Sequence, residues 1–373
     1  MVEKEHKAAG EEWVECAKCG GWQHHICALF NATKNKEEEP DYTCPRCYIH
    51  EIQHEERVPL PPSAVPGAKE LPRTMLSDHI EKRLFASLEQ ERRERAEALG
   101  KSTTEKIEQV DVIVFAMFAQ EYGPECDYPN KDSVYISYID SVKHLRPQIK
   151  TVHGEALRTF VFHELLIGYM DYCKRQGLAK CHIWICPPKK KEDYILYCHP
   201  DDQNIPTSEK LQNWYQFMIE KAIKGKVAVA FSYLHEHFYG PHSENKMTAT
   251  NLPFFEGGFF QSITDKVIDF IKKLEERGER EALTSRKRKK PNSSSPDSYE
   301  NSAKDILLMK KAEVNDIAFD HRDEDGIICN KFIENREEFL KFCVKHRYQF
   351  DTLRRAKHST AMILYHLHEP SDG

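Results

Sequence analysis

Three pairs of side chains near the amino-terminal end of the sequence have the types and the spacing of zinc ligands. Two residues separate the members of each pair, which are Cys16 and Cys19, His24 and Cys27, and Cys44 and Cys47. Two thiolates at this spacing can hold one tetrahedral zinc ion through a tight turn of the backbone. His25 is a competing donor, but the usual His-x-x-Cys spacing favours its neighbour. Free surface cysteines are the alternative, and the repeated spacing favours zinc.

A second group of residues could bind a phosphate-bearing ligand and move a proton. Arg158 and Thr159 stand where a helix is predicted to begin, and unpaired backbone amides and the helix dipole attract phosphate there. Tyr215 follows Trp214 on another predicted helix, and a phenol that is neutral at pH 7 can donate a proton to a leaving thiolate. Taken alone, a Trp-Tyr pair is more often core packing, and an arginine at a helix start is often only solvated.

The elements that must position these residues alternate between strands and helices. Apolar runs rich in strand formers predict strands at residues 134–139, 181–186 and 194–198. An apolar stripe at three- and four-residue intervals predicts a helix from about Leu157 to Gly177, where glycine suits the left-handed cap. Strand, helix and strand in this order predict an α/β fold with a central mixed sheet flanked by helices.

Six motifs in this region resemble the acetyltransferase core of the CREB-binding-protein type histone acetyltransferases. They occupy residues 135–141, 157–159, 163–169, 182–188, 193–200 and 211–215. The sequence is most similar to the plant members, which share the longer segment at residues 148–156. The resemblance covers most of residues 11–275 and resumes at about residues 329–368.

The resemblance implies a lysine acetyltransferase that uses acetyl-CoA. Tyr215 would then be the general acid, and Trp184 would orient the incoming lysine beside its aliphatic stem. The residues that would line the cofactor are Ile139, Asp140, Ser141, Arg158, Thr159, Gln203, Asn204, Lys210 and Trp214. The family usually has lysine and arginine where this sequence has Asn204 and Lys210. The alternative that stays open is a chromatin or transcription scaffold that kept this fold and lost turnover.

The paired cysteines resemble the second half of a PHD finger, a fold in which alternating pairs share a metal. By that pattern Cys16, Cys19, Cys44 and Cys47 would complete one Zn²⁺ site. His24 and Cys27 would belong to a second site, whose first cysteine pair should lie upstream, and no cysteine precedes Cys16. A zinc-dependent ubiquitin ligase is a weaker alternative that would rest on these cysteines alone.

Composition shifts predict the boundaries of the parts. We expect the partial finger at residues 11–50, a proline-rich linker at 51–70, the core at 71–275 and 303–369, and a disordered basic and serine-rich loop at 276–302. A helix is expected from about Ser77 to Ala98, a strand at residues 110–115, a mainly helical stretch at 216–275 that breaks near residues 239–241, and another helix around Phe339 and Cys343.

The sequence departs from the family at three places. Where relatives carry several strands, only a short polar connection at residues 100–109 precedes the next strand, so either an edge of the sheet should be exposed or the core should be short of apolar cover. Gly258 stands where relatives have an aspartate near the substrate path, and His358 replaces an expected tryptophan. Glu334 and Glu337 fall where the family carries acidic residues along its substrate groove.

Composition limits the partners. The sequence has 373 residues and a formal net charge of −6, which fits basic partners and does not favour a nucleic-acid binder. No apolar run approaches a membrane span, so no membrane partner is expected. Sequence-specific binding of nucleic acid is not expected either. The five basic residues at 286–290 indicate nuclear import. The resemblance implies histones, other lysine-containing proteins, and transcription factors or coactivator complexes as partners.

Overall fold

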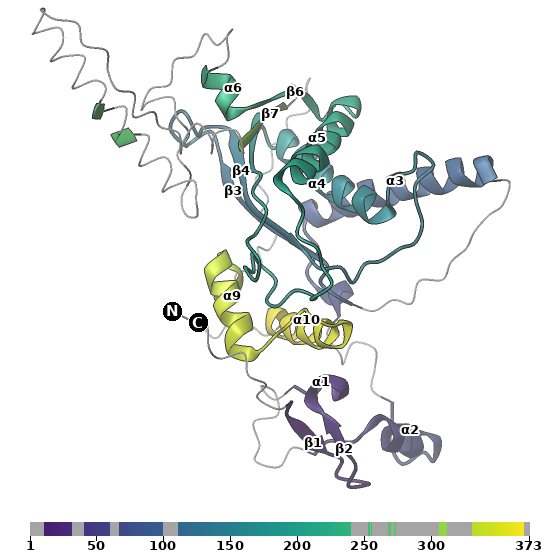
Figure 1. The fold of residues 1–373 in the computed structure, drawn as a ribbon. Helices are drawn as coiled ribbons and strands as arrows, with labels where there is room; N and C mark the ends of the chain where they lie inside the picture. The colour runs from purple at the N-terminus through teal and green to yellow at the C-terminus, as the bar shows by residue number, and fades with distance from the viewer. Residues whose placement is uncertain are drawn as a thin grey trace, which may run out of the picture.

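The computed structural model describes residues 11–31, 41–59, 67–99, 111–239, 253, 255, 268–269, 272–273, 306–311 and 330–368. Within these residues a small finger precedes a larger domain built on a mixed sheet (Figure 1). None of the helices in these ranges has the length and apolar character needed to cross a bilayer.

Five strands form the central sheet in the order β3-β4-β5-β7-β6. Their bounds are β3 Phe115–Tyr122, β4 Ser133–Ser141, β5 Lys180–Trp184, β6 Ala228–Tyr233 and β7 Ile306–Lys311. Strands β4 and β5 are parallel, and the other neighbouring pairs are antiparallel. The predicted mixed sheet flanked by helices is confirmed. Within the described residues β3 pairs with β4 alone and forms one edge, as the short connection before it leads us to expect.

Helix α4 (Leu157–Arg175) is the crossover between the parallel strands β4 and β5. It ends as predicted, because Gly177 takes φ = 85° in the left-handed region and donates its N–H to the carbonyl of Lys174 at 3.0 Å. Helix α5 (Ser208–Lys224) begins at Thr207, whose side chain accepts the N–H of Lys210 at 3.3 Å. The end of α4 and the start of α5 are therefore fixed by local capping contacts.

One face of the sheet packs on α4 and α5. Buried side chains from these helices and from β4 and β5, among them Ile136, Leu166, Ile183 and Met218, form a single core cluster. Helix α3 (Met75–Leu99) lies against the outer side of α4, which confirms the helix predicted at about 77–98 (Figure 1).

Helices α9 (Arg336–His346) and α10 (Leu353–His368) complete a second core cluster with the end of β4. A short 3-10 helix, η3 (Lys331–Ile333), leads into α9. Phe339 and Cys343 of α9 are buried there, and Phe350 between the two helices is fully buried. The predicted helix around Phe339 and Cys343 is confirmed.

The finger contains β1 (Trp13–Glu15), β2 (Trp22–His24), α1 (His25–Ala28) and α2 (Pro45–Gln53). Helix α1 contacts α10, so the finger lies beside the closing helices of the larger domain (Figure 1). Helix α2 continues into the stretch expected as a linker, and η2 (Ala68–Glu70) lies at its other end.

Three predicted elements differ from the structure. The strand expected at residues 110–115 begins instead at Phe115 and runs to Tyr122, because Thr360 takes the N–H of Ile113 before the ladder starts. Residues 194–198 form bends, because the carboxylate of Asp140 takes the N–H groups of Ile195 and Leu196 that a strand would need.

The helical stretch expected beyond residue 216 ends at Lys224. A tight turn at Lys226, which has φ = 59°, leads into β6, and β6 then pairs with β7. Helix α6 (Leu234–Tyr239) follows β6. The connection at residues 100–109, Gly258 and the basic loop at residues 276–302 lie outside the described residues.

Candidate functional site

A pocket of about 420 Å³ opens at the carboxyl ends of the parallel strands β4 and β5. The start of α4 and the first turns of α5 complete its wall. Ligands of open α/β sheets bind at this end of parallel strands, and small-molecule pockets commonly have volumes of this order.

All eleven residues that the sequence assigned to catalysis or cofactor binding line this pocket. They are Ile139, Asp140, Ser141, Arg158, Thr159, Trp184, Gln203, Asn204, Lys210, Trp214 and Tyr215. The structure thus brings together segments that lie far apart in the sequence. It adds lining residues that sequence reasoning did not single out: Phe115, Tyr135, Ser137, Tyr138, Phe162, Cys186, Pro188, Tyr194, Pro206 and Leu211.

Asp140 fixes the loop of residues 193–199, which we call the clamp loop. Its Oδ2 accepts the N–H groups of Ile195 at 2.8 Å and Leu196 at 2.9 Å, and its Oδ1 lies 2.7 Å from Nε2 of His199. Burial opposes protonation of His199, but its hydrogen bonds to Asp140 and Asp193 outweigh burial and raise its pKa to about 9. The carboxylate of Asp140 therefore holds the pocket wall in place.

Arg158 places a positive charge at the beginning of α4. Its guanidinium donates to Oγ of Ser141 at 3.0 Å and lies 5.1 Å from the ring centre of Phe162. Burial and the neighbouring Arg146 lower its pKa. Its Nε is buried without a hydrogen-bond partner among the described residues, and Ala156 provides no side-chain cap for the helix. An anion at this helix start would satisfy both the guanidinium and the amides.

The side chain of Gln203 joins the segment before α5 to the end of β4. Its Nε2 donates to the carbonyl of Ser141 at 2.7 Å, and its Oε1 accepts the N–H of Lys143 at 2.8 Å. Asn204 and Lys210 lie on the exposed rim beyond it. Gln203 is thus a structural link, whereas the other two side chains remain accessible to a ligand.

Tyr215 is the most deeply buried polar residue of the pocket wall on α5, with 4% of its surface exposed. Burial raises the pKa of its phenol, so the hydroxyl stays protonated at neutral pH. The ring of Trp214 meets the ring of Tyr215 edge to face at 5.0 Å between centroids. Both side chains lie in the second turn of the helix, as predicted.

A buried polar group lies behind Trp214. The ring of His163 is 4.4 Å from the ring of Trp214, and its Nδ1 is 3.2 Å from Oε1 of Glu155 and from Nζ of Lys221. The ammonium of Lys221 contacts both carboxylate oxygens of Glu155 at 2.6 and 2.7 Å. Burial lowers the pKa of His163, which keeps the imidazole neutral at physiological pH. Trp214 and Lys221 are seven residues apart and so lie on the same face of α5. This spacing was the signal in the sequence that could have pointed to this cluster.

The pocket becomes aromatic near the end of β5. The hydroxyl of Tyr194 donates to the carbonyl of Cys186 at 2.9 Å, and the ring of Tyr194 meets that of Tyr138 edge to face at 5.7 Å. Trp184 lines the same end of β5. Burial raises the pKa of Tyr135 and of Tyr194, so both phenols are neutral. These tyrosines were present in the motifs, but their contact across the pocket depends on the clamp loop.

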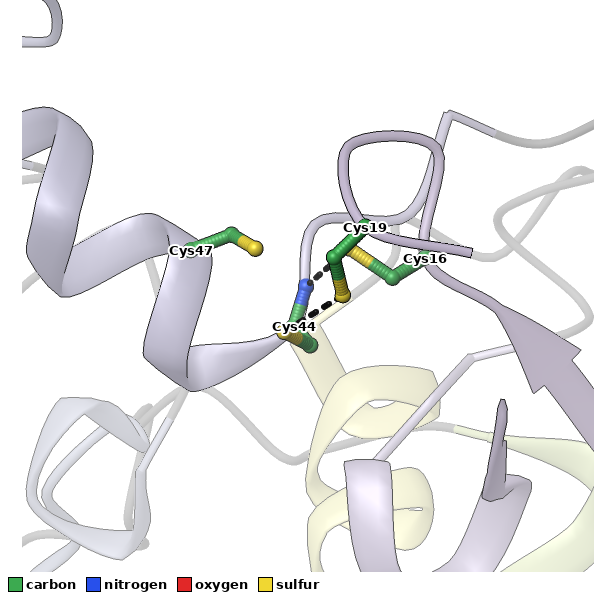
Figure 2. Close-up of side chains that lie close together, drawn as sticks. All are labelled: Cys16, Cys19, Cys44 and Cys47. Carbon is green, nitrogen blue, oxygen red and sulfur yellow. Dashed lines mark hydrogen bonds between the residues drawn. The ribbon is translucent and has the colours of Figure 1, made fainter. Parts of the chain in front are cut away.

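Four cysteines of the finger form a metal site (Figure 2). The sulfur atoms of Cys16, Cys19, Cys44 and Cys47 all lie within 4.8 Å of one another, and Sγ of Cys19 is 3.9 Å from Sγ of Cys44. Four thiolates bound to one tetrahedral zinc would be about 3.8 Å apart. The N–H of Cys44 donates to Sγ of Cys16 at 3.3 Å, as expected for a thiolate ligand. This donor set fits a structural zinc ion.

His24 and Cys27 are not part of that cluster. Nδ1 of His24 is 4.0 Å from Sγ of Cys27, and the sulfur accepts a hydrogen bond from Arg354 of α10 at 3.1 Å. Glu11 contacts both Arg354 and Nε2 of His24. In the described residues the four cysteines alone form a metal-binding group, and the second predicted site stays a prediction.

His358 lies away from the pocket. Its Nε2 is 3.4 Å from the carbonyl of Phe30, so this departure from the family falls where α10 meets the finger. Glu334 is exposed between η3 and α9, and Glu337 is exposed in the first turn of α9. His163 and Glu164 do not share a metal, because Glu164 contacts Arg83 at 3.1 Å and Ser87 at 2.9 Å instead.

Comparison with known proteins gives two family matches. A family model described as "Histone acetyltransferase domain KAT3" matches residues 81–364, and one described as "PHD-finger" matches residues 3–47.

Individual relatives agree with the family matches. The chain is 37% identical to Histone acetyltransferase HAC1 of Arabidopsis thaliana, over 99% of this chain and 29% of the relative. It is 36% identical to Probable histone acetyltransferase HAC-like 1 of Oryza sativa subsp. japonica, over 97% and 29%. It is 32% identical to Protein cbp-1 of Caenorhabditis elegans, over 71% and 15%.

The chain therefore spans about 29% of the length of these plant relatives. The alignment with the Arabidopsis protein extends over 497 positions, which is more than the 373 residues of this chain, so that relative carries segments that this chain lacks.

Proposed function

Because the chain belongs to the KAT3 family of histone acetyltransferases, we propose that it transfers the acetyl group of acetyl-CoA to lysine side chains of histones. The observation that carries this proposal is the convergence of a basic helix start, a buried phenol and an aromatic wall on one pocket of about 420 Å³. A thioester nucleotide needs the first feature, its leaving thiolate needs the second, and a lysine stem fits the third.

The pyrophosphate of acetyl-CoA docks at the beginning of α4 in this proposal. Arg158 supplies a charged donor, and the amides of the first turn add the positive end of the helix dipole. Lys210 on the exposed rim can reach a further phosphate from the start of α5. The backbone of Ile139 and Ser141 at the end of β4 forms the floor under the pantetheine arm.

Tyr215 acts as the proton donor. The neutral amine of the lysine attacks the thioester carbonyl, a C–N bond forms and the C–S bond breaks. The departing thiolate receives the phenolic proton of Tyr215, and the proton lost by the amine restores the phenol through solvent. Burial keeps this hydroxyl protonated before the reaction, so the donor is ready over the whole physiological range of pH.

The lysine side chain enters along Trp184, Tyr138 and Tyr194. Flat aromatic faces pack well against the methylene groups of its stem. Asp140 is the acidic residue of the described pocket lining, and its carboxylate is engaged by the clamp loop. The charged form of lysine therefore finds no free carboxylate there, which favours entry of the neutral amine.

The cellular part of the proposal follows from the family and from charge. The net charge of −6 suits basic histone tails, and we place the protein in the nucleus, at chromatin, with transcription factors or coactivator complexes as further partners. The zinc-bound finger serves as a structural neighbour of the acetyltransferase domain.

Incubation with labelled acetyl-CoA and core histones tests the function. Wild-type protein should label the histones, and Tyr215→Phe should reduce kcat by roughly a hundredfold or more, because general acid catalysis contributes about that factor. The matched control is Tyr128→Phe, which removes the hydroxyl of an exposed tyrosine outside the pocket and should leave the rate unchanged.

Three outcomes separate the alternatives. Equal rates for wild type and Tyr215→Phe would remove Tyr215 from the chemistry. No labelling by wild type, together with tight binding of acetyl-CoA in calorimetry, would favour the scaffold that lost turnover. No labelling and no binding would reject the pocket as a thioester site.

A further inference from the structure

One arginine, Arg336, lies outside the pocket and binds the backbone of the clamp loop, which forms part of the proposed lysine site. Arg336 is the first residue of α9 and lies more than 140 positions after the clamp loop in the sequence. Its Nε donates to the carbonyl of Tyr194 at 2.5 Å, and a terminal nitrogen donates to the carbonyl of Asp193 at 3.0 Å. One planar guanidinium thus binds two consecutive carbonyls of the clamp loop.

The same guanidinium also covers an aromatic side chain of the pocket. Its central carbon lies 4.5 Å from the ring centre of Tyr138 on β4. Tyr138 and Tyr194 both line the pocket and contact each other edge to face. Arg336 therefore contacts the ring of Tyr138 and the backbone of Tyr194, and so bridges β4 and the clamp loop at this point.

Arg336 and Asp140 bind different backbone groups of the clamp loop. Asp140 binds the N–H groups of residues 195 and 196, whereas Arg336 binds the carbonyls of residues 193 and 194. A positive charge at the first position of a helix opposes the helix dipole, so this arginine is not placed there to stabilise α9 itself. Phe339 and Cys343 anchor α9 in the second core cluster and so fix the base of the side chain.

We propose that Arg336 is a positioning residue for the acceptor lysine. It holds Tyr138 and Tyr194 at the separation that accepts a lysine stem beside Trp184, and it does not contribute to the phosphate-binding side of the pocket. This inference rests on the proposed acetyltransferase function. It predicts that loss of Arg336 weakens binding of the acceptor peptide and leaves binding of acetyl-CoA intact.

The test compares acceptor and cofactor in the same protein. We would measure kcat and KM for an amino-terminal histone H3 peptide, the Kd of that peptide by calorimetry in the presence of CoA, and the Kd of acetyl-CoA. Arg336→Ala should raise the KM and the Kd of the peptide roughly tenfold, because the two charge-assisted hydrogen bonds that hold the clamp loop beside Tyr138 are lost. The Kd of acetyl-CoA should change less than about twofold, which is within 0.5 kcal/mol.

Two further variants keep the test sharp. Arg336→Lys keeps the charge but cannot bridge two carbonyls with one planar group, so the KM of the peptide should remain raised. It also covers the case in which Arg336→Ala does not fold. Lys341→Ala is the control, because Lys341 lies on the exposed face of α9 and contacts Glu338 and not the pocket.

The outcomes distinguish this inference from the proposed function. Unchanged peptide binding in Arg336→Ala, or an equal loss of acetyl-CoA affinity, would overturn the positioning role. A wild-type protein that transfers no acetyl group would overturn the function, and calorimetry of the peptide would still decide the role of Arg336.

Discussion

Asp140 lies where the sheet, the pocket and the clamp loop meet. The family motif assigned it to the cofactor, and it does line the pocket. Its carboxylate, however, makes four hydrogen bonds to other parts of the chain, with the amides of Ser141, Ile195 and Leu196 and with the ring of His199. A sequence motif identifies such a residue but does not separate a ligand contact from a structural contact.

The pair of His199 and Asp140 should make stability depend on pH. The pKa of His199 is raised to about 9 in the folded protein, from an ordinary value near 6.5. Its contribution to the free energy of unfolding is therefore fully present below pH 6.5 and is lost as pH rises through about 9. The shift corresponds to roughly 3 kcal/mol.

Chemical unfolding of wild type and His199→Gln at several pH values checks this. The difference in the free energy of unfolding should be largest at pH 6 and should shrink by pH 10. His153→Gln, which changes an exposed side chain, is the control. A difference that stays constant from pH 6 to pH 10 would contradict the proposed ion pair.

Arg158 should govern the affinity for acetyl-CoA. Removing a charge-assisted hydrogen bond costs about 1.5–3 kcal/mol, so Arg158→Gln should weaken the Kd of acetyl-CoA by about ten- to a hundredfold. The remaining affinity should depend less steeply on salt, because one charge contact to phosphate is lost. Isothermal calorimetry of acetyl-CoA and of pantetheine, which has no pyrophosphate, measures both effects. Arg175→Gln at the exposed end of α4 is the matched control, and an equal loss for pantetheine would argue against a phosphate contact.

One face of helix α5 carries both Trp214, which lines the pocket, and Lys221, which lies outside it. Lys221 and Glu155 hold His163 against Trp214, so the position of the pocket wall depends on a half-buried ion pair two turns beyond Trp214. Lys221→Met should lower the free energy of unfolding by about 1–3 kcal/mol, because Glu155 then loses its charged partner. Urea titration followed by circular dichroism measures this change.

The neighbouring residue Lys224 gives the control for that experiment. It lies in the last turn of α5, is exposed, and Lys224→Met should leave stability within about 0.5 kcal/mol of wild type. A change as large as that of Lys221→Met would show that charge on the helix end, and not the ion pair of Lys221 with Glu155, stabilises α5.

Elements with a strong period could be predicted from sequence, and elements set by tertiary contacts could not. The apolar stripe and Gly177 identified α4 and its end, and the run around Ile183 identified β5. Residues 194–198 have the composition of a strand, but side chains of Asp140 and Arg336 bind their backbone groups. Strand β6 was missed because its apolar residues follow directly on a helix, and its partner β7 lies more than 70 residues later in the sequence.

The residues of the candidate site also fall into two groups, those that sequence motifs identified and those that depend on tertiary packing. The motifs located eleven of the residues that line the pocket, because most of these lie at the end of a strand or in the first turns of a helix. The residues that support the site were not identified: Arg336 comes from α9, and His163 and Lys221 lie on α4 and α5 behind Trp214. Their participation depends on how α9 and α5 pack, which periodicity alone does not specify.

At the scale of the whole molecule, the finger and the acetyltransferase domain share an interface on α10. Glu11 of the finger contacts Arg354 and Arg355, and the Arg354 hydrogen bond lowers the pKa of Glu11. His358 reaches the carbonyl of Phe30. Two turns of the same helix thus face the finger, while Thr360 of α10 binds the N–H of Ile113 just before β3.

Zinc should therefore stabilise more than the finger. A structural zinc site supplies folding free energy directly, so removal of the ion should unfold the finger and release the contacts of Glu11 and Phe30 with α10. Each exposed ion pair is worth only about 0–1 kcal/mol. We therefore expect the main calorimetric transition of the acetyltransferase domain to move down by a few degrees, with the Kd of acetyl-CoA changed less than about twofold.

Differential scanning calorimetry of the full chain before and after treatment with a chelator checks this expectation, with zinc content measured in parallel. Cys44→Ser, which removes one ligand of the four-cysteine site, should reproduce the shift without a chelator, and Cys126→Ser outside the finger should not. Re-addition of zinc should restore the transition of wild type and not that of Cys44→Ser. An acetyltransferase transition that stays at the same temperature after zinc loss would mean that the interface on α10 contributes no stability to the larger domain.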